Sequence, residues 1–204
     1  MTAKISVQDW LITAMEEPLG RINETYYYDR RANEFFSIFI TDYFLLSGLY
    51  DSPISSPYTP EELATLKDRA GRIESNESSI LGIPRLTVIQ RKQILKDFFE
   101  SGKFNLDKAN IQAIIKGEDG TKLFDLGADI SGEIKREWNT YKTKRIIQIV
   151  ETFCNLNLID PDSASLFTDE KVTSMNLALA HNSRIPVIRR ESKKQQKPWW
   201  KFWK

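Results

Sequence analysis

The order of apolar and polar residues first predicts an amphipathic helix close to the N-terminus. Its apolar positions recur three and four residues apart, at Val7, Trp10, Leu11, Ala14 and Met15. Ser6 can cap this helix, Asp9 occupies the third helical position, and Pro18 marks the end. We therefore expect a helix with one buried face and one polar face.

Two β-prone runs follow, at 25–28 and 34–40, and the segment between them is polar and turn-like. This pattern predicts an antiparallel hairpin, in which Asn33 can take the left-handed position of a bulged turn. A short helix or an extension is expected at 41–46. Because side chains alternate along a strand, only one face of the hairpin needs to be buried in the core.

The later helices are marked mainly by their first residues. Thr59–Glu62 and Thr87–Gln90 both fit the capping-box pattern of a threonine followed three residues later by Glu or Gln. Ser131 opens the longest predicted helix, which Asp160 and the following proline stop. Three apolar residues of this helix are expected to pack on the sheet: Trp138, Tyr141 and Phe153.

These elements together predict an α+β fold: a small antiparallel sheet packed by several helices, with a C-terminal helical segment and a disordered basic-aromatic tail. The expected limits are 1–160 for the α+β domain, 161–183 for the helical extension and 184–204 for the tail. Within these limits we expect a short helix and a loop at 103–132, and a last helix at about 168–180. The length of 204 residues fits one large domain with an appendage.

The overall composition is that of an ordinary soluble globular protein. With 41% hydrophobic and 28% charged residues, it excludes a wholly disordered chain and a collagen-like repeat. No apolar run approaches the roughly 20 residues that span a bilayer, and the first residues lack the apolar core of a secretory signal. The single cysteine, Cys154, excludes an internal disulfide. We therefore expect a cytoplasmic protein, which could be peripheral to the inner face of the membrane.

Charge is distributed unevenly along the chain. Residues 184–204 contain eight basic side chains and one acidic residue, Glu191, for a net charge of +7. Because the whole chain carries +1, the preceding residues carry about −6. An acidic body and a basic tail are suited to different partners.

The end of the tail is also rich in aromatic residues. Its contact residues are expected to be Lys197, Trp199, Trp200, Lys201, Phe202, Trp203 and Lys204. Tryptophan favours the membrane–water interface and lysine favours anionic head groups, so an anionic membrane surface is one expected partner. The same rings and charges could stack bases and neutralise phosphates of a nucleic acid, or the tail could fold back or have no partner.

Residues suited to catalysis are few. The chain has one cysteine and one histidine, His181, whose spacing does not point to a nucleophile–base pair, and together they exclude the usual structural zinc sites. Three carboxylate pairs are better explained as helix-terminal or solvated charges: Glu16-Glu17, Glu61-Glu62 and Asp160–Asp162. We therefore predict no catalytic residue, no cofactor and no metal ligand.

The aromatic hairpin offers a second possible contact surface. If one face of the hairpin is exposed, Tyr26, Tyr28 and Phe35 could bind a protein partner or a base. The competing interpretation is that these rings are core residues.

Three groups of residues resemble an uncharacterised bacterial protein family, number 158 of the UPF series. The first runs from Met15-Glu-Glu to Tyr26-Tyr-Tyr-Asp29 and Glu34-Phe-Phe-Ser-Ile38. The second comprises Gly82-Ile-Pro84 and Ile94-Leu-Lys-Asp-Phe98, and the third Glu137-Trp138 to Phe153-Cys154 and Leu158. The resemblance covers about residues 5–159, although the 103–132 segment is longer than in the family. It implies an α+β fold and assigns no activity.

From these observations we expect a non-enzymatic interaction or adaptor protein that binds an unknown protein partner and has a tail suited to membrane contact. The alternative is a nucleic-acid-associated regulator that uses the tail together with Lys142, Lys144 and Arg145 of the long helix. A further alternative is an enzyme of unknown class.

Overall fold

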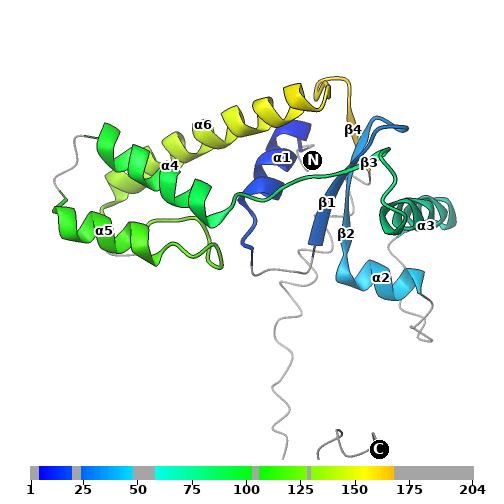
Figure 1. Cartoon of the computed structure of the whole chain (residues 1–204), viewed down its shortest axis with the longest axis horizontal. Coiled ribbons are helices and arrows are strands. Elements are labelled where there is room, and N and C mark those ends of the chain that lie inside the picture. The colour runs from blue at the N-terminus through cyan, green and yellow to red at the C-terminus, as the bar shows by residue number, and fades with distance from the viewer. Residues whose placement is uncertain (1–4, 20–23, 48–57, 103–105, 128–129, 168–204) are drawn as a thin grey trace, which may run out of the picture. The chain divides into compact units, whose positions relative to one another are not determined.

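The computed structural model describes residues 5–19, 24–47, 58–102, 106–127 and 130–167. These residues form an α+β fold, as predicted, with helices around a four-stranded sheet (Figure 1). In chain order the elements are α1 (Val7–Glu16), β1 (Glu24–Asp29), β2 (Glu34–Phe39), α2 (Ile40–Leu46), α3 (Pro60–Glu74), β3 (Ile80–Gly82), α4 (Val88–Ser101), α5 (Lys108–Gly117), α6 (Gly132–Leu156) and β4 (Ser165–Leu166).

The chain divides into two units, 1–169 and 170–204, and the second lies outside the described residues. The predicted helix at 168–180 and the tail at 184–204 therefore lie outside the described residues as well. Residues 161–167, which the sequence placed in a helical extension, form a turn and β4. The folded sheet thus includes residues beyond the expected limit at 160.

Side-chain caps start the helices at the predicted positions. The Ser6 hydroxyl accepts a hydrogen bond from the Asp9 amide at 3.0 Å. Thr59 and Thr87 both form complete capping boxes with the residue three positions later, and Ser131 caps α6. Each cap satisfies an amide that has no partner within the helix, which is why these boundaries could be predicted locally.

The strand order of the sheet is β3-β1-β2-β4. β1 and β2 form the predicted antiparallel hairpin, with Tyr28 opposite Phe35, and Asn33 has a left-handed backbone with a φ of 53°. β3 pairs antiparallel with β1, whereas β4 pairs parallel with β2. The sheet is therefore mixed rather than wholly antiparallel, because the chain returns through α3 to α6 before it reaches the β2 edge.

Both faces of the hairpin are covered by helices. On one face Trp10 of α1 packs against Tyr26 and Phe35, with ring centroids 5.2 and 5.8 Å apart. On the other face Leu66 of α3 packs with Phe36 and Ile38. Figure 1 shows α1 and α3 on opposite sides of the sheet. The hairpin is thus the centre of two hydrophobic clusters.

The long helix α6 contributes to the larger cluster along most of its length. Ile146, Val150 and Cys154 are buried on one side of the helix. Trp138 is also fully buried, but its ring contacts Phe98 of α4 and Phe124 of the loop between α5 and α6 rather than the sheet. The prediction that Trp138 is a core residue is confirmed. The prediction that it packs on the sheet was wrong.

The C-terminal end of α6 is closed by a Schellman motif. The Ile159 amide donates to the Cys154 carbonyl at 2.9 Å, and the Leu158 amide donates to the Asn155 carbonyl at 3.3 Å. In this motif the residue directly after the C-cap needs a positive φ and is therefore usually glycine. Here it is Leu158, with a φ of 56° and a side chain that is 92% exposed.

Replacing Leu158 with glycine should raise the free energy of unfolding by about 1 kcal/mol, because glycine has no Cβ to strain the left-handed backbone. Urea denaturation monitored by circular dichroism measures the change. Leu156→Gly is the matched control, since Leu156 is 78% exposed but helical, and this change should lower stability by about 0.5–1 kcal/mol. A destabilised Leu158→Gly variant would contradict the assignment of strain to this position.

Candidate functional site

The structure places the three rings of the predicted hairpin surface in the core. The exposed fractions are 7% for Tyr26, 6% for Tyr28 and 0% for Phe35. The tyrosine hydroxyls bind within the fold, that of Tyr26 to Glu24 and that of Tyr28 to Asn33. These rings are therefore not available to a partner, which corrects the surface interpretation. The physical reason is that helices cover both faces of the sheet.

The other sequence-predicted contact residues divide into two groups. Those of the tail, from Lys197 to Lys204, lie outside the described residues, as does His181. On α6, Lys142 is ion-paired with Glu16 and donates to the Phe124 carbonyl, and Arg145 faces Asp97. Of the three basic residues proposed for nucleic-acid contact on this helix, only Lys144 is exposed without such a partner.

The carboxylate pairs have local roles in the described structure. Glu62 completes the α3 capping box, Glu16 pairs with Lys142, and the Asp160 carboxylate accepts from the Asp162 amide. Within the described ranges, no group of three or more histidine, cysteine, aspartate or glutamate residues is placed to hold a metal ion. In the same part of the chain, no helix is both long enough and apolar enough to cross a membrane.

A buried ionic cluster, which the sequence analysis missed, joins α3 to the hairpin. We call it the Asp29 cluster, and it consists of Asp29, Glu34, Arg69 and Arg72. The Asp29 carboxylate accepts from Arg69 Nε at 3.0 Å and from Arg72 Nη2 at 2.6 Å. Arg69 also reaches Glu34 at 2.5 Å, so the four charges balance. The balance shows why these side chains can be buried together.

The surroundings of the Asp29 cluster set its protonation state. Burial opposes ionisation of Asp29, but hydrogen bonds from Arg72 and Arg69 outweigh it and lower the pKa of the carboxyl to about 2. The Arg69 guanidinium lies between two rings, 4.6 Å from the centroid of Phe36 and 4.6 Å from that of Phe167. Asp29 is thus ionised at neutral pH, and the cluster acts as a structural link between α3 and the hairpin.

A second buried cation lies at the end of α1. Arg91 is fully buried and donates to the carbonyls of Glu16 at 2.6 Å, Glu17 at 3.1 Å and Leu86 at 3.3 Å. The last turn of α1 has no basic residue of its own, so Arg91 of α4 supplies the positive charge that this helix end favours. Burial lowers the pKa of the guanidinium, but arginine remains charged at neutral pH. This contact orients α1 against α4.

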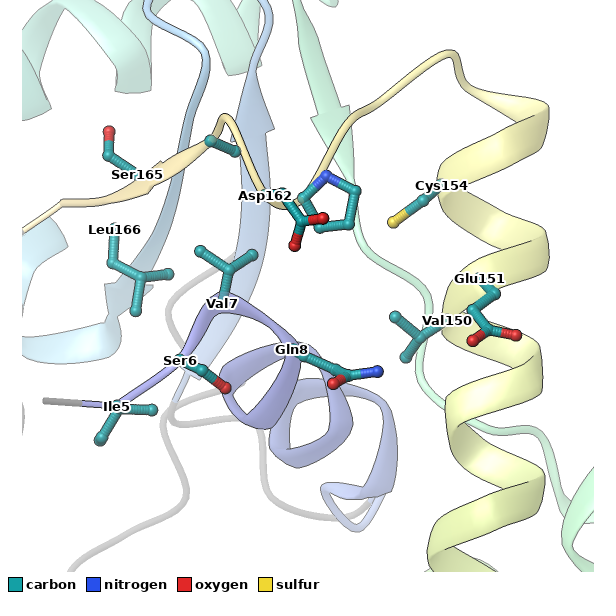
Figure 2. Close-up of a pocket in the computed structure, with 12 residues that line it drawn as sticks. Ile5, Ser6, Val7, Gln8, Val150, Glu151, Cys154, Asp162, Ser165 and Leu166 are labelled. Atoms are coloured by element: carbon teal, nitrogen blue, oxygen red, sulfur yellow. The ribbon is translucent and has the colours of Figure 1, made fainter.

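A recess lies between α1, α6 and the 161–166 segment, and we call it the α1–α6 groove (Figure 2). Its volume is about 640 Å³, within the range of ligand-binding sites. The lining residues are Ile5, Ser6, Val7, Gln8, Val150, Glu151, Cys154, Pro161, Asp162, Ala164, Ser165 and Leu166. Figure 2 shows Val150 and Cys154 pointing from α6 toward the groove, and Gln8 extending from α1 toward α6.

The groove has an apolar floor and a polar rim. Val7 and Leu166 are partly buried and pack against the main core, while Gln8, Glu151 and Asp162 are exposed. Cys154 is only 2% exposed, and burial raises the pKa of its thiol. A buried thiol with a raised pKa is a poor nucleophile, so the groove has the character of a binding surface rather than of a cysteine active site.

No family model matches the chain, and no curated protein or solved structure is significantly similar to it. The resemblance to family 158 of the UPF series therefore stays a prediction.

Proposed function

We propose that the protein is a non-enzymatic interaction protein, an adaptor that attaches reversibly to an anionic membrane surface through its basic-aromatic tail. The observation that carries this proposal is the sequence of the last eight residues, in which three lysines alternate with four aromatic residues. Pro198 separates the four aromatic residues from any preceding helix. Such a composition is typical of segments that lie at a membrane–water interface.

The physical strength of such an attachment can be estimated from its parts. Each lysine or arginine close to an anionic surface contributes about 1 kcal/mol, and the tail has a net charge of +7. Tryptophan rings add interfacial burial, so several of these residues together support reversible, micromolar binding. The preceding residues carry about −6, and their repulsion from the same surface favours attachment by the tail alone.

Flotation with vesicles of phosphatidylcholine and phosphatidylserine tests the proposal. The natural chain should float with the vesicles, and a variant with Trp199, Trp200 and Trp203 changed to serine should remain mostly in the soluble fraction. Raised salt should weaken the natural chain's binding, because screening reduces its electrostatic part. Changing Lys197, Lys201 and Lys204 to glutamine should have a similar effect.

The matched control changes three exposed lysines of the folded unit to glutamine: Lys67, Lys108 and Lys122. This variant has the same net charge as the tail-lysine variant and should still float. Equal loss in both lysine variants would mean that net charge, not the tail, drives binding. Absence of flotation by the natural chain, with tight salt-dependent binding to single-stranded nucleic acid, would replace the proposal with its nucleic-acid alternative.

A further inference from the structure

None of the residues that line the α1–α6 groove belongs to the tail invoked for membrane attachment, and the geometry of the groove fits an extended chain. It is open, since six of its lining residues are exposed: Ile5, Ser6, Gln8, Glu151, Asp162 and Ser165. An enclosed pocket would bury most of a small ligand, whereas an open groove with an apolar floor suits a polypeptide segment.

The strand that lines this groove is the outermost strand on the β2 side of the sheet. The amides of Ser165 and Phe167 donate to the carbonyls of Asn33 and Phe35, at 3.1 and 2.8 Å. Because backbone groups alternate in direction along a strand, the N–H and C=O of Leu166 point to the opposite side, away from β2. Among the described residues, β4 therefore offers a short open edge, to which an extended peptide can add as a further strand.

The charges at the groove determine which peptide is favoured. Glu151 and Asp162 each carry a carboxylate for which the described residues provide no hydrogen bond or ion pair, and none of the twelve lining residues is basic. In Figure 2 the Asp162 carboxylate points toward α1 and the groove. Lysine or arginine side chains would complement this rim, while apolar side chains would cover the floor at Val7 and Val150.

We propose that the α1–α6 groove binds a basic peptide segment of a partner protein, with large apolar side chains, as an added strand along β4. This rests on the proposed interaction function but not on membrane attachment. The two have separate readouts, since flotation depends on the tail and peptide binding on Glu151, Asp162 and β4.

The first test is selection of binders from a random peptide display library on the full natural chain. The same selection is repeated on a full chain with Trp199, Trp200 and Trp203 changed to serine, because the natural tail has the chemistry of the expected ligand. Selected peptides should be enriched in lysine or arginine alternating with leucine, isoleucine, phenylalanine or tryptophan. A failure to select any peptide from either chain, or selection without this bias, overturns the proposal.

The second test locates the binding of the best selected peptide by fluorescence anisotropy. Glu151→Lys with Asp162→Lys should weaken binding about tenfold and reduce its salt dependence. Glu74→Lys with Asp125→Lys is the matched control, because both residues are exposed and away from the groove, and it should bind like the natural chain. Equal weakening in both variants would show a nonspecific charge effect and overturn the proposal.

The third measurement tests the added strand without changing the protein. Methylating the amides of alternate peptide residues removes the hydrogen-bond donors on one edge of an extended peptide. Methylation at one set of alternate positions should abolish binding. Methylation at the other set should leave the affinity within a few-fold of that of the unmethylated peptide. Equal effects of the two sets would exclude pairing with β4.

Discussion

Changing Trp138 to alanine should lower the free energy of unfolding by about 3–5 kcal/mol, the largest effect expected from a single core residue here. The Trp138 side chain is fully buried, and its ring lies at right angles to Phe124 with centroids 5.1 Å apart. Phe98 packs on it at 5.2 Å. Removing the indole leaves a cavity between α4, α6 and the loop that contains Phe124. Urea denaturation measures the loss.

Two further variants test whether the loss of stability in Trp138→Ala comes from the packing of the buried ring. The indole Nε1 of Trp138 is buried and has no hydrogen-bond partner within the described ranges. Trp138→Phe should therefore cost less than half as much as Trp138→Ala, because it removes an unsatisfied donor together with part of the ring. Leu123→Ala, at a side chain that is 65% exposed, should change stability by less than about 0.5 kcal/mol. A loss below about 1 kcal/mol for Trp138→Ala would contradict the packing described.

Features set by nearby residues could be predicted from the sequence. The caps at Ser6, Thr59, Thr87 and Ser131 all act within one helical turn, and these four predicted helix starts are confirmed. The β1–β2 hairpin is equally local, since two β-prone runs enclose a polar turn. Propensity and capping are sufficient there because no distant part of the chain is needed to decide the backbone conformation.

Features that depend on distant contacts were missed or assigned wrongly. β4 has only two residues, and only its pairing with β2, more than a hundred residues earlier, makes it a strand. The burial of Tyr26 and Tyr28 depends on α1 packing over them, which the alternation of residues in the hairpin does not reveal. The α1–α6 groove likewise combines three separate segments.

The Asp29 cluster did leave a signal in the sequence. In α3, Arg69 lies three residues after Leu66 and directly before Ala70, so it shares the apolar face of the helix. A charged residue on a buried face requires an opposite charge from another element. Asp29 and Glu34, which lie next to the turn of the hairpin, provide this opposite charge. The sequence does not show that α3 lies against them.

Asp29→Asn should lower the free energy of unfolding at pH 7 by about 3–5 kcal/mol, because it leaves Arg69 and Arg72 buried without the carboxylate that binds both. Asp68→Asn is the matched control. Asp68 also pairs with Arg72, at 2.8 Å, but its side chain is 63% exposed, so this change should cost less than about 1 kcal/mol. Similar losses in the two variants would mean that burial does not strengthen the Asp29 contacts.

We also expect the stability difference between the natural chain and Asp29→Asn to depend on pH. The pKa of Asp29 is lowered to about 2 in the folded protein, whereas an unfolded aspartate has a pKa of about 3.9. As the pH falls below the unfolded value, the unfolded state binds a proton that the folded state does not, so the stabilisation by ionised Asp29 is lost. About 2–3 kcal/mol of the difference between the natural chain and Asp29→Asn should therefore be present above about pH 5 and disappear toward pH 2. Denaturation series at several pH values measure this difference. A gap that stays constant or widens on acidification would show that the carboxylate is not ionised within the Asp29 cluster.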